Sequence, residues 1–314
     1  MAKAPAGADI EIAGVRLSSP EKVLFPEHGV TKRELALYYV AVAERILPHV
    51  ARRPITLVRC PAGRQRTCFY QRHAGSAASP ELGQITVAGF EQSGAYLYVK
   101  DLRGLVALVQ MGVLEIHPWN ARIDRTDRPD RVIFDLDPGE GVAMPEVVAA
   151  AHEVRAALAE MALESFVKTS GGKGLHVVLP IARRHGWDEV KAFARAVGEE
   201  LARRAPARYL VRMSKAERRG RILVDYLRND PTSTAVAPYS SRAREGAPVS
   251  MPLSWEEVEP DLAPARFDLR SIPSGLAAGR PDPWAGIDGL RQTLPGTDRL
   301  FRRRSGGGTP PAAL

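Results

Sequence analysis

Short apolar, β-branched runs alternate along this chain with helical segments, and this alternation is what most limits the folds open to it. Strands are predicted over five runs: 54–59, 95–99, 114–117, 131–136 and 221–227. Helices are predicted over four segments: 31–50, 104–111, 145–163 and 187–204. Residues 165–181 have the pattern of a strand, a glycine turn and a second strand. Because strands and helices interleave without a repeat, we expect an α/β or α+β fold, with a central sheet covered by helices.

The composition is that of a folded protein from a reducing compartment. Apolar residues are 45% of the 314 and charged residues 25%, both near globular averages, so one large body is expected. Cys60 and Cys68 are too few for a disulfide framework and lack the CxxC spacing of a zinc site. No segment is long and apolar enough to span a bilayer, so we expect no membrane role and a cytoplasmic location.

Positive charge is concentrated in one part of the sequence. The net charge is +8, and Glu217 is the single acid between 203 and 221. That stretch has eight basic residues: Arg203, Arg204, Arg208, Arg212, Lys215, Arg218, Arg219 and Arg221. Such a field attracts phosphodiester backbones, although a solvated helix end and loop would give the same pattern.

The sequence RVIFDLDPGEG ends an apolar strand with two acids, Asp135 and Asp137. Residues two apart on a strand point to one face, so the carboxylates converge, with backbones roughly 7 Å apart. Two like charges held that close need a cation, and hard oxygen ligands suit Mg²⁺ or Mn²⁺. The alternative is a pair of solvated aspartates at a strand end.

A third acid, Asp225 in ILVDYL, lies within another apolar strand, where an unpaired carboxylate would be costly. Three carboxylates on adjacent strands could hold two metal ions. Two ions stabilise both the attacking and the leaving oxygen of an in-line phosphoryl displacement.

The sequence KTSGGKGLHVVLP places a glycine-rich turn between two strands. Gly171, Gly172 and Gly174 allow close approach of a ligand to the backbone, and Lys173 adds positive charge. We expect a triphosphate to fit there, with hydrogen bonds from Ser170 and His176 beside the turn. The turn lacks Walker spacing, and a simple hairpin with a structural histidine is the alternative.

A further histidine, His117 in LEIHPWN, ends a strand close in sequence to the acidic pair. It could contact a nucleotide or the metal shell, or it could be a core histidine.

Taken together, EIHPW, FDLDP, SGGKGLHV and VDYLRN resemble, in order and spacing, the polymerase domain of bacterial ligase D, within the archaeo-eukaryotic primase superfamily. The resemblance runs from about Ser18 to about Phe301. It implies a primase-like core of mainly antiparallel sheets at 18–301, an N-terminal extension at 1–17 and a flexible tail at 302–314.

The resemblance also implies roles for these residues. Asp135, Asp137 and Asp225 would bind two divalent ions, preferably manganese, and would position a nucleotide against a primer 3′-hydroxyl. Nucleotide ligands would be His117, Ser170, Gly172, Lys173, Gly174, His176, Arg242 and Arg244, with Arg244 the weaker of the two arginine assignments.

DNA contacts follow from the same resemblance. Lys22 and Lys32 match a pocket for the 5′-phosphate at a break, and Phe69 and Tyr70 match rings that stack on template bases. The family commonly has phenylalanine at both ring positions, so Tyr70 departs from it mildly. A mobile primer loop would include Arg212, Lys215 and Arg218.

The implied activity is ribonucleotide-preferring nucleotidyl transfer, gap filling and terminal addition at DNA ends during non-homologous end joining. Ku and a DNA ligase activity would be its partners, beside the nucleoid. No ligase or phosphoesterase motif is present in the sequence. A metal-dependent nuclease, a non-catalytic end-bridging module and a true primase are the alternatives.

Overall fold

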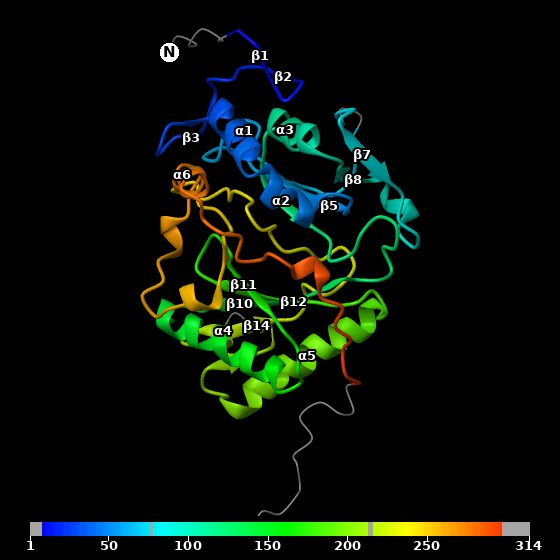
Figure 1. The fold of residues 1–314 in the computed structure, drawn as a ribbon, viewed down its shortest axis with the longest axis vertical. Helices are drawn as coiled ribbons and strands as arrows, with labels where there is room; N and C mark the ends of the chain where they lie inside the picture. Colours follow the sequence, from blue (N-terminus) through cyan, green and yellow to red (C-terminus); the bar gives the residue numbers. More distant parts are fainter. Residues whose placement is uncertain (1–7, 76–77, 213–215, 297–314) are drawn as a thin grey trace, which may run out of the picture.

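The computed structural model describes residues 8–75, 78–212 and 216–296. Two β-sheets form its centre, each with helices on its outer side, and the segment after β14 runs between them (Figure 1). This arrangement leaves one face of the larger sheet turned toward the other half of the molecule.

The larger sheet has six strands, antiparallel except for the β13–β14 pair. In spatial order they are β13 (Tyr209–Leu210), β14 (Ile222–Asp225), β10 (Arg131–Pro138), β12 (Leu175–Pro180), β11 (Phe166–Thr169) and β15 (Pro252–Leu253). Val132, Phe134 and Leu136 alternate with the acids of β10 and belong to the main core. Helices α4 (Met144–Ala159) and α5 (Trp187–Arg204) cover that apolar face.

The smaller sheet has five strands and is covered by three helices (Figure 1). Its strands are β6 (Phe69–Gln71), β5 (Ile55–Arg59), β8 (Tyr96–Val99), β7 (Leu82–Ile85) and β9 (Val113–Pro118), which pairs with β5. The helices are α1 (Lys32–Ala41), α2 (Ala43–Val50) and α3 (Leu102–Gln110). Two hairpins lie outside these sheets, β1–β2 (Ile10–Ile12, Val15–Leu17) and β3–β4 (Val23–Phe25, Val30–Thr31). Helix α6 (Ser271–Ala277) also lies outside them. Short 3₁₀ turns occur at Glu91–Ser93, Ala216–Arg218, Trp255–Glu257, Pro264–Arg266 and Ile287–Gly289.

The expected α+β class with mainly antiparallel sheets is confirmed. The expected single helix over 31–50 is wrong, because the chain bends at Val42 between α1 and α2. The bend lets the hydroxyls of Tyr38 and Tyr39 reach the segment at Tyr239 and Ser241 while Ile46 still packs in the core. No described helix is long and apolar enough to cross a membrane.

The N-terminal boundary expected at Ser18 falls directly after the β1–β2 hairpin, whose Leu17 is buried. The tail expected at 302–314 lies outside the described residues. Both boundaries stay predictions.

Cys60 and Cys68 form a disulfide, which the expectation of a reducing environment did not anticipate. The β5–β6 pairing brings the two cysteines together, because Arg59 lies opposite Phe69 and each cysteine is the next residue toward the connecting loop. The bond therefore closes the loop that leads into β6.

An ion pair joins the chain just before β5 to the chain just before β10. Arg53 donates two hydrogen bonds to Asp130, with Nη1 2.7 Å from Oδ1 and Nη2 2.6 Å from Oδ2. The arginine side chain is 1% exposed. Burial alone would raise the pKa of Asp130, but the Arg53 charge overcomes it and lowers the pKa to about 2. The two sheets are thus tied together by a buried, bidentate contact.

Replacing Asp130→Asn should lower the free energy of unfolding at pH 7 by at least about 2 kcal/mol, because the carboxylate titrates lower when folded and its loss leaves Arg53 unpaired. The carboxylate's contribution is present above its ordinary pKa near 3.8 and is lost as pH falls through about 2. The difference between wild type and variant should therefore shrink between pH 4 and pH 2 in urea titrations. The exposed Arg183–Asp124 pair is the control, and Asp124→Asn should cost less than about 1 kcal/mol. An equal cost for both variants would contradict the assignment.

Candidate active site

One row of side chains crosses the six-stranded sheet and includes two of the predicted acids. Strand pairing sets Asp135 opposite Asp225 on one side and opposite His176 on the other, and it sets His176 opposite Lys168. Side chains directly opposite each other on adjacent strands lie on one face of the sheet. Asp137, two residues along β10 from Asp135, shares that face. The row therefore unites residues that are far apart in the sequence.

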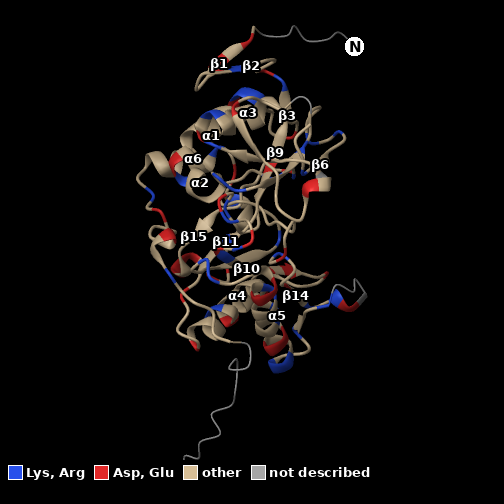
Figure 2. Ribbon diagram, turned by 90° about the vertical axis from the view of Figure 1, so that its right-hand side faces the viewer, with Lys and Arg blue, Asp and Glu red and all other residues tan. Residues whose placement is uncertain are grey.

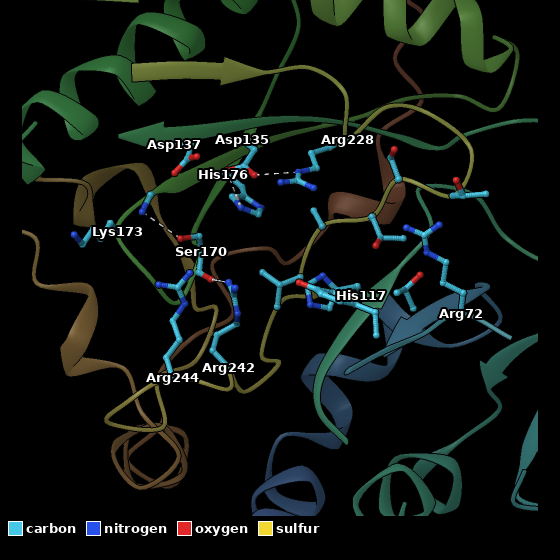
Figure 3. A pocket seen from close by; sticks show the side chains of 18 residues that line it. Arg72, His117, Asp135, Asp137, Ser170, Lys173, His176, Arg228, Arg242 and Arg244 are labelled. Atoms are coloured by element: carbon cyan, nitrogen blue, oxygen red, sulfur yellow. Dashed lines mark hydrogen bonds and ion pairs between the residues drawn. The ribbon is translucent and has the colours of Figure 1, made fainter. Parts of the chain in front are cut away.

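Two arginine side chains contact the three carboxylates, and one of them, Arg228, is seen beside Asp135 in Figure 3. The Nε of Arg228 lies 3.1 Å from Oδ2 of Asp135 and 3.3 Å from Oδ2 of Asp225. Nη1 of Arg218 lies 3.0 Å from Oδ2 of Asp137. Because one guanidinium reaches both Asp135 and Asp225, these two carboxylates converge as the sequence predicted. Asp225 ends β14, and was wrongly expected within the strand.

Burial and neighbouring charges give the three acids different pKa values. Burial would raise the pKa of Asp135, but His176, with Nε2 3.2 Å from Oδ1, and Arg228 hold it well below its ordinary value. Burial and the Asp135 charge raise the pKa of Asp137. Burial also raises the pKa of Asp225, with a further contribution from Asp135. Asp137 and Asp225 thus carry their charges at a cost that an added cation would relieve.

The donor set fits a hard divalent cation such as Mn²⁺ or Mg²⁺, since all three candidate ligands offer carboxylate oxygens. Within the part of the chain that the structure describes, no three His, Cys, Asp or Glu side chains are arranged to hold a metal ion as they stand. Arg228 and Arg218 supply the positive charge in this arrangement. Metal binding would require the guanidinium groups to yield their contacts with the carboxylates.

The glycine turn packs against the end of the acidic strand. Ser170 accepts a hydrogen bond from the Gly174 amide at Oγ, and its own amide donates to the Gly174 carbonyl. Gly171 has φ +67°, and a Cβ at Gly174 would lie 2.3 Å from the carbonyl oxygen of Leu136. The turn can therefore approach the acids only with glycine at these positions.

A cavity of about 490 Å³ opens between these elements. In Figure 3, Ser170, Lys173, Arg242 and Arg244 lie to one side of the acids, and His117 and Arg72 lie to the other. The remaining lining residues are Thr56, Tyr70, Asp135, Asp137, Gly174, His176, Arg228 and the stretch 232–236. The predicted nucleotide ligands thus meet around one space, except Gly172, which lies beside Arg244 in a neighbouring hollow. Asp225 is buried behind Arg228 and does not line the cavity.

Several side chains at this site were not singled out from the sequence. Arg228 lies three residues after Asp225, and its position in VDYLRN was a usable signal. Lys168 is buried, and its Nζ donates to Oγ of Ser250 at 2.7 Å. Burial lowers the pKa of Lys168 well below its usual range, and the Arg242 charge adds to this. Glu115 is buried beside His117. The partner of Lys168 comes from a distant segment, so no local pattern marks that lysine. Glu115 precedes His117 by two residues in EIHPW, and this spacing was a usable signal.

The candidates for the 5′-phosphate pocket and for base stacking are neighbours. The amide of Lys32 donates to the carbonyl of Lys22 at 2.8 Å, and Nζ of Lys22 reaches the carbonyl of Pro61. Pro61 directly follows Cys60, and Cys68, the disulfide partner of Cys60, directly precedes Phe69. Phe69 and Tyr70 are 44% and 72% exposed, and Tyr70 also lines the cavity. These contacts place the two groups beside each other, and their roles stay predictions.

The basic stretch carries less unpaired charge than its sequence indicates. Glu200 contacts both Arg203 and Arg204, and Glu153 contacts Arg208. Glu160 adds a second contact to Arg204. Glu153 lies on α4, Glu160 directly follows α4, and Glu200 lies on α5, where acidic and basic residues occur together (Figure 2). The sequence count, with Glu217 as the single acid of this stretch, therefore misses acids that lie beside the stretch in the folded chain. Arg212 is exposed, Arg218 contacts Asp137, and Lys215 lies outside the described residues.

Replacing Arg228→Ala should lower stability in metal-free buffer by about 1–2 kcal/mol, because Asp135 and Asp225 lose their shared counter-charge. Mn²⁺ should then raise the melting temperature of the variant more than that of the wild type, since a cation bound to the folded state stabilises it. Thermal unfolding with and without Mn²⁺ measures both effects. Arg195→Ala, which removes the exposed Arg195–Glu199 pair, should respond to Mn²⁺ as the wild type does. Equal Mn²⁺ responses in all three proteins would show that Arg228 does not compete with a cation for these acids.

Comparison with known proteins agrees with this geometry. Residues 31–284 match the family model described as LigD, primase-polymerase domain. The chain is 40% identical over 309 residues to the multifunctional non-homologous end joining protein LigD of Pseudomonas aeruginosa, covering 98% of this chain and 36% of that protein. It is 35% identical over 271 residues to the Mycolicibacterium smegmatis protein of that name, covering 85% of this chain and 35% of that protein.

A solved structure gives the same result for the fold. The polymerase domain of Mycobacterium tuberculosis ligase D, in complex with DNA, superposes with a TM-score of 0.80 at 32% identity, covering 88% of this chain and 99% of that one. The chain thus spans about a third of the length of these curated relatives and nearly all of the solved domain. With its four motifs gathered around one cavity, the chain belongs to the LigD primase-polymerase domain family, a family of nucleotidyltransferases.

Proposed function

We propose that this chain adds nucleotides to the 3′ ends of broken DNA during non-homologous end joining, by template-directed gap filling and by terminal transfer. The observation that carries the proposal is the packing of the glycine turn on the end of the acidic strand, at Gly174 and Leu136. That contact sets a cradle for a triphosphate directly beside a site for divalent cations. A nuclease would need the cation site but not the triphosphate cradle beside it.

Within the cavity, the triphosphate would lie against Ser170, Lys173 and the two arginines of the 242–244 segment. Arg242 is already oriented there, because its Nη1 donates to the carbonyl of Ser170. Bound Mn²⁺ or Mg²⁺, two ions on Asp135, Asp137 and Asp225, would neutralise the charge on the phosphoryl oxygens. The protein's own contribution is to hold the α-phosphate in line with the primer 3′-hydroxyl.

DNA would approach over the β3–β4 hairpin and β6. Lys22 and Lys32 form a pair of like charges: burial, with a further contribution from Lys22, lowers the pKa of Lys32 to about 8. A 5′-phosphate would add a counter-charge beside Lys22. Lys32 is 7% exposed, and its Nζ would have to leave the Ser18 carbonyl and Gln110 to reach that phosphate. The exposed rings of Phe69 and Tyr70 lie next to it and suit sequence-independent stacking on template bases.

The relatives' names and the DNA bound to the solved domain motivate the wider assignment. We propose a preference for ribonucleotides, a location in the cytoplasm beside the nucleoid, and Ku and a DNA ligase activity as partners. We propose that Arg212, Lys215 and Arg218 engage the primer strand. For Arg218 this would mean leaving Asp137 when a metal ion arrives.

Replacing Asp137→Ala should reduce nucleotide incorporation at least about 100-fold in a primer-extension assay, because charge stabilisation at the phosphate is lost. DNA binding, measured by fluorescence anisotropy, should largely survive. Asp127→Ala, at an exposed aspartate paired with Arg128, should behave as wild type. Retained repair function in the Asp137→Ala variant would instead favour a non-catalytic bridging module. Failure of the wild type to bind a nucleoside triphosphate with Mn²⁺ would favour a nuclease.

Extension across a gap should be faster when the downstream end carries a 5′-phosphate. Lys22→Ala should reduce that preference about tenfold, the value of a charge-assisted hydrogen bond, whereas Lys100→Ala at another exposed lysine should not. The preference should also weaken as pH rises from 7 to 9, because Lys32 loses its proton through about pH 8. Equal rates on phosphorylated and unphosphorylated gaps would remove both lysines from the pocket.

A further inference from the structure

A buried carboxylate behind the cavity wall contacts two of the side chains that line it. Glu115 on β9 is 5% exposed and does not itself line the cavity. Its Oε2 lies 2.8 Å from Nε2 of His117 and 3.1 Å from Nε of Arg242. Its Oε1 accepts a hydrogen bond from the amide of Ala243 at 2.9 Å. One carboxylate therefore joins β9 to the segment that carries the arginines.

The ionisation of this group fixes the proton on the histidine. Burial would raise the pKa of Glu115, but the contacts with His117 and Arg242 lower it to about 2. Burial lowers the pKa of His117 despite the opposing charge of Glu115. An ionised carboxylate only accepts hydrogen bonds, so a neutral His117 must carry its proton on Nε2. Its other nitrogen, Nδ1, is then an acceptor.

We propose that Glu115 is a positioning residue, which holds His117 in the Nε2–H form and aims Arg242 at the phosphate end of the cavity. The inference rests on the proposed function for its effect on nucleotide binding, but not for the tautomer. An acceptor nitrogen cannot bind a phosphate oxygen, which has no proton to donate. His117 therefore accepts a hydrogen bond from a sugar hydroxyl at Nδ1, and Arg242 binds the phosphates. Glu115 thus gives the cavity a sugar end and a phosphate end.

Backbone attachment does not require this carboxylate. Three other hydrogen bonds already join β9 to the segment before Arg242: Ala237 N to Ile116 O at 2.9 Å, Ile116 N to Ser240 Oγ at 2.9 Å, and Ser241 Oγ to Leu114 O at 2.6 Å. Glutamine at 115 would still accept from the Ala243 amide. What glutamine cannot supply is the negative charge on Oε2 shared by His117 and Arg242. The Glu115→Gln variant therefore removes the proposed positioning role while it leaves the backbone contacts intact.

The first experiment measures the affinity of wild type and Glu115→Gln for a nucleoside triphosphate with Mn²⁺ by isothermal titration. The dissociation constant should rise about tenfold or more, the usual effect of removing a partner that orients a ligand residue. Glu200→Gln is the matched control, since Glu200 is also buried and contacts two arginines, but on α5, away from the cavity. Its affinity should be unchanged. Equal affinities for wild type and Glu115→Gln would overturn the proposal.

A double-mutant cycle tests whether Glu115 acts through His117 and Arg242. In a background carrying His117→Asn and Arg242→Ala, the further change Glu115→Gln should alter the affinity less than about twofold. A full tenfold loss in that background would assign Glu115 a general structural role and would refute positioning.

The second experiment observes the tautomer directly and needs no nucleotide. Long-range ¹H–¹⁵N spectra of ¹⁵N-histidine-labelled protein separate Nε2–H from Nδ1–H rings, and the spectrum of His117→Asn identifies one signal among the seven histidines. Wild type should show Nε2–H at His117, and Glu115→Gln should shift it toward Nδ1–H. An Nδ1–H ring in the wild type would sink the inference. If the wild type shows Nε2–H but binds no nucleotide, the proposed function fails while the tautomer assignment stands.

Discussion

Negative charge that is buried on one face of a sheet must be balanced within that face, and this requirement organises the centre of the molecule. Asp135 and Asp225 lie side by side on neighbouring strands, Asp225 buried and Asp135 largely so. An uncompensated carboxylate in such a place would cost several kcal/mol. Arg228 provides the compensating charge on one side. On the other side His176, whose pKa burial lowers to about 4, contributes a hydrogen bond to Asp135. The same groups would be displaced or shared when a cation and a triphosphate arrive, so the balance that stabilises the fold also prepares the site for its ligands.

The second requirement is that both halves of the molecule contribute to one cavity. The acids and the glycine turn belong to the larger sheet, whereas His117 and Tyr70 belong to the smaller one. Arg53 and Asp130 tie the two sheets at their starts, and Glu115 ties β9 to the segment of Arg242 near the cavity. Buried ionic contacts at both places fix the relative position of the sheets. The rigidity of the cavity therefore depends on these contacts.

Much of the fold and most of the site could be predicted from the sequence. The alternation of β10 gave the orientation of Asp135 and Asp137, and the glycines of 171–174 gave the turn, because both signals are local. Helix α5 was predicted with its observed ends for the same reason. The bend at Val42, the disulfide and the pairing of Arg203, Arg204 and Arg208 with acids on α4 and α5 were missed. The bend, the disulfide and the Arg208–Glu153 pair depend on contacts that form only in the folded chain. Glu200, by contrast, lies three and four residues before Arg203 and Arg204 on one helix, so their pairing had a local signal.

The contact between Gly174 and Leu136 has a consequence for how this site can change. Main-chain atoms of Gly174 and Leu136 set the distance between the glycine turn and the acids, so substitutions of neighbouring side chains leave this distance intact. If the proposed function holds, variation in substrate choice would arise at other lining residues, such as Thr56 and 232–236. A directed-evolution library confined to these positions would preserve the spacing between the turn and the acids.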